Sequence, residues 1–200
     1  IYCERYFPAT SKKRMEDLIK NLEVSLAERI KAQDWMSEAT KKAALEKLST
    51  FYVKVGYPNK WKDLSQLKID PTKSYYENVQ NCQLFWAEDA IKEKAGKPVD
   101  KDKWLMTPQT VNAYYNPTTN EICFPAGILQ YPFFDPKADD AFNYGAIGVV
   151  IGHEMTHGFD DQGRHYDKDG NMTDWWTEED GKNFEARTGK YADFFSAIKV

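Results

Sequence analysis

The chain has 200 residues, of which 42% are hydrophobic and 29% are charged, a composition typical of a folded protein. Its 27 lysines and arginines face 31 aspartates and glutamates, so the net charge of −4 leaves no basic field to attract nucleic acid. Three cysteines without a CxxC pair exclude a cysteine-type zinc site. The longest nearly apolar run, residues 144–152, is too short to span a bilayer.

The first half of the chain has mainly helical patterns. Apolar residues at spacings of three and four predict a helix over residues 11–33 and a second one after Met36, with Ser37 as its N-cap. Residues 52–58 change to a strand pattern that ends in Gly-Tyr-Pro. Residues 73–95 return to the helical pattern.

The second half adds a small β element and an apolar helix. Residues 111–115 and 121–124 flank a Pro/Asn-rich turn and predict a β-hairpin. Residues 138–158 predict one helix, buried because it is apolar nearly all round. Three glycines on one of its faces predict close approach of another element: Gly145, Gly148 and Gly152. Together the patterns predict a mainly α fold with a small β-hairpin or sheet, in the α+β class.

Two of the three histidines lie in the motif His153-Glu154-Met155-Thr156-His157, at the end of this helix. Residues four apart on a helix are rotated by only about 40°, so His153 and His157 can meet one metal ion from the same side. Glu154 lies about 60° from His157, close enough to hold a water. This spacing is that of the zinc-peptidase pattern HExxH, with two ligands and a general base. The plainer interpretation is that the histidines are hydrogen-bonded core residues, but three polar groups on a buried helix favour a metal site.

A catalytic zinc site needs a third protein ligand. Asp160 and Gly163 stand where the metzincin continuation requires glycine and histidine, so that class is excluded, and His165 is off its spacing. Three later glutamates follow Thr177, the expected N-cap of another helix, and we do not favour them as ligands: Glu178, Glu179 and Glu185. We expect the third ligand beyond Val200.

Residues 167–171 imitate a calcium-binding loop, with Glu178 eleven residues after Asp167. The glycine that such a loop needs at its sixth position is replaced by Met172. We therefore expect a plain Asp-Gly turn here.

A wider set of sequence segments points to one family: residues 111–115, 120–122, 124–130, 132–134, 143–145, 151–154, 156–161 and 175–177, with Gly148, Gly163 and Gly170. In these segments the chain resembles the neprilysin/endothelin-converting-enzyme family of zinc metallopeptidases. The resemblance extends over about residues 35–190 and is specific in the second half.

This resemblance implies a zincin-type, thermolysin-like catalytic core, of which this chain holds a part. It implies one Zn²⁺ held by His153 and His157, with Glu154 as general base and Asp160 orienting a ligand histidine. Residues that would bind the substrate are Asn112 and Ala113, for its backbone, and Ile128, Phe133, Val149 and Val150, for a hydrophobic side chain.

The family likeness also implies a function for the whole protein: a metalloendopeptidase that cleaves short peptides on the amino side of hydrophobic residues. Residues 1–55 would be a helical lead-in that links to a second, cavity-covering domain, and residues 56–200 the N-terminal part of the catalytic domain. The family's third ligand, a glutamate in an ExxxD motif, would follow Val200, so we expect the isolated chain to be inactive. An extracytoplasmic location is implied by the resemblance alone, and the expected partners are peptide substrates, not nucleic acid.

Two other classes of function remain open on the sequence. The chain could be a non-catalytic helical interaction fragment, which a lack of chelator-sensitive peptidase activity would favour. It could also belong to a zinc hydrolase of non-peptide amides, which a peptide library would distinguish.

Overall fold

Long helices dominate the part of the chain that the computed structural model describes, residues 1–199. Two units are distinguished and are described separately: Ile1–Tyr57 with the chain from Trp104 onward, and Pro58–Lys103. The first unit also contains a three-stranded sheet, so the predicted α+β class is confirmed. None of the helices in residues 1–199 combines the length and the hydropathy needed to cross a membrane.

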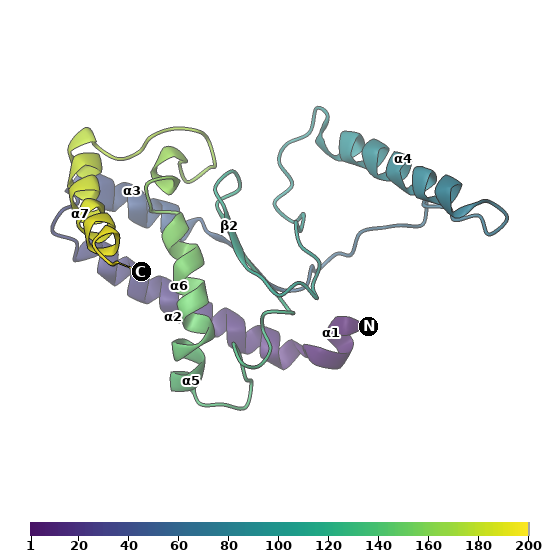
Figure 1. The fold of residues 1–200 in the computed structure, drawn as a ribbon, viewed down its shortest axis with the longest axis horizontal. Helices are drawn as coiled ribbons and strands as arrows, with labels where there is room; N and C mark the ends of the chain where they lie inside the picture. Colours follow the sequence, from purple (N-terminus) through teal and green to yellow (C-terminus); the bar gives the residue numbers. More distant parts are fainter. Residues whose placement is uncertain (200) are drawn as a thin grey trace. The chain divides into compact units, whose positions relative to one another are not determined.

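The first unit begins with a short helix, α1 (Tyr2–Tyr6), and a helical hairpin. The hairpin consists of α2 (Ala9–Lys31) and α3 (Glu38–Ser49), which turns back along α2 (Figure 1). The apolar stripe of α2 is buried at Met15, Leu18, Ile19 and Ile30. Ser37 accepts a hydrogen bond from the Thr40 N–H and caps α3, as predicted.

The sheet is mixed, with the strand order β1-β3-β2. β1 (Tyr52–Gly56) pairs parallel with β3 (Glu121–Pro125), and β2 (Tyr114–Asn116) pairs antiparallel with β3. The predicted hairpin is thus confirmed, although its first strand begins at Tyr114 and not at residue 111.

The two faces of the sheet differ in character, because side chains alternate along a strand. One face joins the main hydrophobic core with Val53, Val55, Ile122 and Phe124. The other carries a set of polar groups: Lys54, Tyr114, Glu121 and Cys123. Lys54 and Glu121 form an ion pair of 2.9 Å there, and both are buried.

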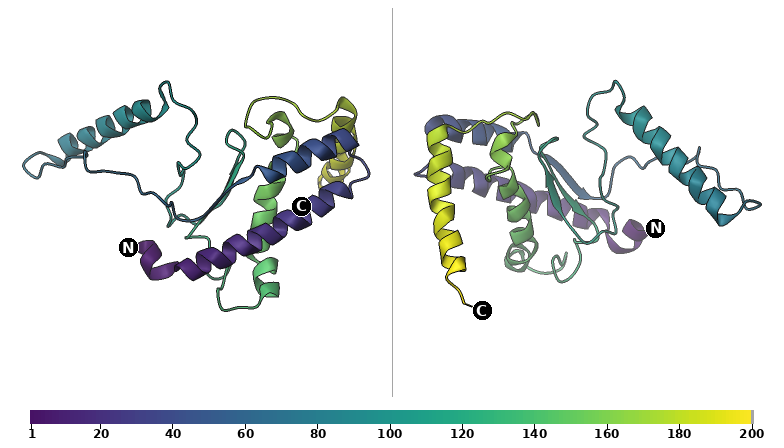
Figure 2. Two further views of the ribbon diagram at one scale, coloured as in Figure 1. Left: turned by 180° about the vertical axis from the view of Figure 1, so that it is seen from behind. Right: turned by 45° about the horizontal axis from the view of Figure 1, so that its top comes forward.

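The structure has two helices where the sequence predicted one continuous helix over residues 138–158, so the prediction of a single helix was wrong. α5 (Asp140–Gly145) and α6 (Ile147–His157) are separated at Ala146, whose φ of −104° and ψ of −89° are not helical. α6 lies across α2 (Figure 2) and buries Ile147, Ile151 and Met155 at spacings of four. No part of residues 1–199 covers its opposite face, where Val149 is 65% exposed.

The predicted close approach to the glycine face is also wrong for the described residues. A Cβ at Gly145 or Gly152 would meet nothing within 4 Å, and a Cβ at Gly148 only α5 at 3.6 Å.

The chain after α6 returns to α3. A 3₁₀ turn, η1 (Gly163–His165), is followed by α7 (Glu178–Ser196), which Thr177 caps as predicted. The carboxylate of Asp180, in the first turn of α7, accepts hydrogen bonds from Ser37, Thr40 and Thr177. It therefore joins the beginnings of α3 and α7.

The second unit, Pro58–Lys103, contains α4 (Tyr75–Lys94), close to the predicted range 73–95. A capping box between Ser74 and Glu77 begins the helix. Glu93 forms ion pairs with Lys62 and Lys103, which hold its pKa at about 2 despite some burial. The division of the chain into residues 1–55 and 56–200 stays a prediction.

Candidate metal centre

The last two turns of α6 place His153, Glu154 and His157 together. Potential ligand atoms of the three side chains all lie within 4.8 Å of one another. The two imidazole Nε2 atoms are 3.1 Å apart, and the ring planes are inclined by 84°. The histidines are exposed, whereas Glu154 is only 8% exposed. The buried residues of α6 fix the helix against α2 and so fix the direction of this cluster.

The donor set fits a zinc ion. Two nitrogens bound tetrahedrally to zinc at about 2.0–2.1 Å lie about 3.3 Å from each other, close to the 3.1 Å between the Nε2 atoms. Imidazole is a ligand that zinc favours, and the exposed side of the pair leaves room for further ligands. His153 and His157 are therefore the residues that could hold the metal.

Asp160 contacts His157 directly. Its Oδ2 lies 2.8 Å from Nδ1 of His157, and a carboxylate can only accept, so Nδ1 carries the proton. The Nε2 lone pair is then free for a metal. The other oxygen, Oδ1, accepts from the backbone N–H groups of Gln162 and Gly163 at 3.0 and 2.7 Å. Asp160 thus has partners on both oxygens, and its predicted role in orienting a ligand histidine stays a prediction.

The residues that the sequence did not favour as ligands lie elsewhere. His165 is 3.4 Å from Asp174, and neither it nor Glu178, Glu179 or Glu185 joins the candidate metal cluster found among residues 1–199. Asp167 accepts hydrogen bonds from the backbone N–H groups of Asp169 and Asn171. With Gly170 at a φ of +84°, the segment is the expected turn.

Of the predicted substrate-binding residues, Val149 and Val150 lie on α6, and Asn112 and Ala113 directly precede β2, an element that contacts α6. Asn112 is exposed, and Ala113, directly before β2, is buried. Ile128 belongs to the hydrophobic core, and Val150 packs against it. Phe133 and Val149 are exposed. Their roles in substrate binding stay predictions.

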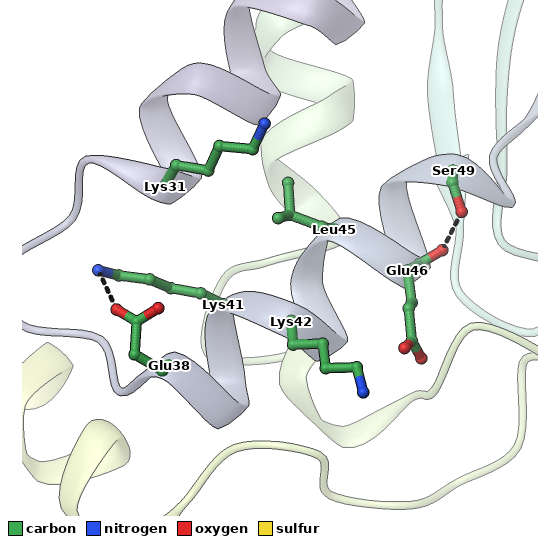
Figure 3. A pocket seen from close by; sticks show the side chains of 7 residues that line it. All are labelled: Lys31, Glu38, Lys41, Lys42, Leu45, Glu46 and Ser49. Atoms are coloured by element: carbon green, nitrogen blue, oxygen red, sulfur yellow. Dashed lines mark hydrogen bonds and ion pairs between the residues drawn. The ribbon is translucent and has the colours of Figure 1, made fainter.

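A shallow hollow of about 410 Å³ lies apart from the cluster, between the end of α2 and α3 (Figure 3). Its lining is mostly charged: Lys31, Glu38, Lys41, Lys42, Leu45, Glu46 and Ser49. Lys41 and Glu38 pair within it at 2.9 Å. It contains no histidine and none of the predicted substrate residues, so we do not assign the peptide to it.

The sequence did not identify Lys47 of α3. This lysine is 1% exposed, and it donates to the backbone carbonyls of Gly163 and Tyr166, which follow α6 in the chain. Burial lowers its pKa to about 8, against the opposing effect of the charges of Asp160 and Asp167. The sequence pattern could have indicated that Lys47 is buried, because Lys47 stands three residues after the buried Ala44 on the apolar face of α3.

Comparisons with known sequences indicate the family to which the chain belongs. Two profiles of peptidase family M13 match the chain, one over residues 1–58 and one over residues 112–200. A neutral endopeptidase of Lactobacillus helveticus is 41% identical over 199 residues, and endothelin-converting enzyme 1 of Homo sapiens is 40% identical over 207 residues. These alignments cover 99% and 100% of this chain but 31% and 27% of the relatives, so the chain spans about a third of their length.

The fold gives the same result. The zinc metalloprotease Zmp1 of Mycobacterium tuberculosis, solved in complex with an inhibitor, superimposes with a TM-score of 0.88 and 51% identity. The match covers all of this chain and 30% of that one. Two family profiles, two relatives at about 40% identity and a solved structure thus converge, and the chain belongs to peptidase family M13.

Proposed function

We propose that the protein to which this chain belongs is a zinc-dependent metalloendopeptidase. The observation that carries the proposal is the pair of Nε2 atoms 3.1 Å apart beside the buried carboxylate of Glu154. His153 and His157 hold the zinc, and a third protein ligand comes from outside residues 1–200. The isolated chain is accordingly expected to bind zinc weakly and to be inactive.

His153 and His157 would hold a zinc ion, which would supply a Lewis acid to polarise the scissile carbonyl and to lower the pKa of a water to about 7. Glu154 accepts the proton of the attacking water and passes it to the leaving amine. Its position fits this role, because its carboxylate lies within 4.8 Å of both imidazoles and is largely shielded from solvent.

An extended peptide is bound along Asn112 and Ala113, next to the outer edge of β2. β2 is one of the two edge strands of the sheet and contacts α6, so a peptide on this edge would pass close to the cluster. A hydrophobic side chain following the scissile bond is received by Ile128, Phe133, Val149 and Val150, which gives cleavage on the amino side of hydrophobic residues.

The test is Glu154→Gln in the intact protein. Loss of the general base lowers kcat/KM for peptides by about 10²–10⁴-fold, with zinc content unchanged. Glu185→Gln, an exposed glutamate of α7, is the matched control and leaves kcat/KM unchanged. Full peptide hydrolysis by the Glu154 variant would refute the assignment of the base. Hydrolysis that survives complete removal of zinc by a chelator would refute the zinc peptidase itself.

A further inference from the structure

Lys47 lies in an aromatic cage next to the candidate metal centre. Its Nζ is 5.3 Å from the ring centre of Trp175, 5.8 Å from that of Tyr115 and 6.0 Å from that of Phe159. Lysine is rarely buried unless its charge is compensated, and the negative faces of aromatic rings compensate a cation only in part. The burial of the Lys47 ammonium group is therefore not explained by packing against the rings alone.

The hydrogen bonds of Lys47 account for this burial. Its Nζ donates to the carbonyl oxygens of Gly163, at 2.8 Å, and Tyr166, at 2.6 Å. Both acceptors are neutral backbone groups, so the ammonium serves to fix the backbone of η1. Trp175 assists, since its Nε1 donates to the same Gly163 carbonyl at 3.3 Å.

Gly163 connects the hydrogen bonds of Lys47 to α6. Its N–H donates to Oδ1 of Asp160 at 2.7 Å, while its carbonyl is held by Lys47. It also packs directly on α6, since a Cβ at this position would lie 2.1 Å from the carbonyl oxygen of His157. A shift of the Gly163 peptide would therefore displace the carboxylate of Asp160.

Asp160 completes the path, because its other oxygen holds Nδ1 of His157 at 2.8 Å. We propose that Lys47 is a positioning residue, which holds His157 in its ligand orientation through Gly163 and Asp160. The proposal rests on the proposed zinc site and adds to it a residue from α3, which ends 108 residues before α6 does. A lysine that served only the fold would leave the affinity for zinc unchanged.

The test compares Lys47→Met, which keeps the aliphatic stem in the cage, with Lys54→Met, the other buried lysine of the unit. Lys54 pairs with Glu121 in the sheet, away from the hydrogen bonds that reach His157. In the intact protein, the zinc Kd is measured by competition with a chromogenic chelator, and the melting temperature is measured on the zinc-free form. We expect Lys47→Met to weaken zinc binding about tenfold or more, at the lower end of the effect of residues that orient metal ligands. Lys54→Met lowers the melting temperature and leaves the Kd unchanged.

A double-mutant cycle with Asp160→Asn tests the path itself. If Lys47 acts through Asp160, Lys47→Met has little further effect on the zinc Kd once Asp160 is replaced. Additive effects of the two substitutions would overturn the proposal, as would a wild-type Kd in Lys47→Met. An equal loss of zinc affinity in Lys54→Met would also overturn it, because general destabilisation would then suffice.

Trp175→Phe provides the same test should Lys47→Met fail to fold. It retains a ring in the cage but removes the second donor to the Gly163 carbonyl, and we expect a weakening of zinc binding by a few fold. An unchanged Kd would refute the importance of that carbonyl. If the wild-type protein binds no zinc, the proposed function and this inference both fail. If it binds zinc and the variants match it, only the inference fails.

Discussion

The carboxylate of Asp180 joins the first turns of α3 and α7, and we predict that Asp180→Asn loosens this junction. Asp180 is 2% exposed, and it accepts from the Ser37 N–H at 2.9 Å and from the hydroxyls of Ser37, Thr40 and Thr177 at 2.6–2.7 Å. An asparagine keeps the size of the side chain but presents an N–H₂ group to hydroxyls that already donate. At least one of these hydrogen bonds is lost in the variant.

The pKa gives the magnitude. Burial raises the pKa of Asp180, but the hydrogen bonds from Ser37, Thr40 and Thr177 lower it more, to about 2 from 3.8. That difference corresponds to about 2 kcal/mol of free energy of unfolding at neutral pH. Since the folded pKa is the lower one, this stability is present above pH 3.8 and is lost as the pH falls towards 2. About 1 kcal/mol of it is gone by pH 3.

The assay is urea unfolding of the intact zinc-free protein at pH 7, 5 and 3, followed by tryptophan fluorescence. The free energy lost in Asp180→Asn is about 2 kcal/mol at pH 7 and shrinks by about 1 kcal/mol at pH 3, because the wild type weakens there. Glu179→Gln removes a neighbouring exposed charge in the same turn of α7 and costs less than about 1 kcal/mol. A penalty that stays constant from pH 7 to pH 3 would refute the reasoning.

Three further substitutions or treatments test other parts of the structure. Gly163→Ala forces a Cβ to within 2.1 Å of the His157 carbonyl oxygen, so we expect a loss of about 1–3 kcal/mol and weaker zinc binding, measured by denaturation and chelator competition. Glu121→Gln removes the negative charge beside the buried Lys54 ammonium and should cost about 3–5 kcal/mol, seen as a lower melting temperature. Burial raises the pKa of the Cys123 thiol to about 12, so at pH 8 a disulfide reagent should react with it about a thousandfold more slowly in the folded than in the unfolded protein.

Each of these three has a result that would contradict it. Zinc binding and stability equal to those of the wild type in the alanine variant would mean that the turn after α6 relaxes without effect on the site. An unchanged melting temperature in the glutamine variant would show that the ion pair contributes nothing net. Fast reaction of the buried thiol would show that the sheet opens readily.

The elements that the sequence predicted well are those determined by neighbours along the chain. The stripe of α2 and the Ser37 cap of α3 depend on residues three or four positions apart, and they were found within about two residues. The break at Ala146 was missed because no proline or cap residue marks it. The parallel pairing of β1 with β3 was also missed, because Tyr52 and its partner Glu121 are 69 residues apart and pairing at that distance leaves no local pattern.

The same division holds for the candidate site. His153, Glu154 and His157 were found because one helix carries all three at a fixed spacing. Lys47 was not, because its acceptors Gly163 and Tyr166 lie 116 and 119 residues further along. Only the fold brings Lys47 and its two acceptors together. From the sequence alone, a lysine on an apolar helix face is interpreted as one that packs its aliphatic chain on the core and keeps its ammonium group in solvent.

The parallel pairing of β1 and β3 has a consequence for how the family can vary. Residues 58–103 lie between β1 and β2 in the sequence. They therefore form an insertion whose two ends must be brought together when the sheet forms. The entropy of closing such a segment grows only with the logarithm of its length, and halving or doubling it changes stability by about 0.6 kcal/mol. The sheet beside α6 can therefore remain the same while evolution lengthens, shortens or replaces this segment.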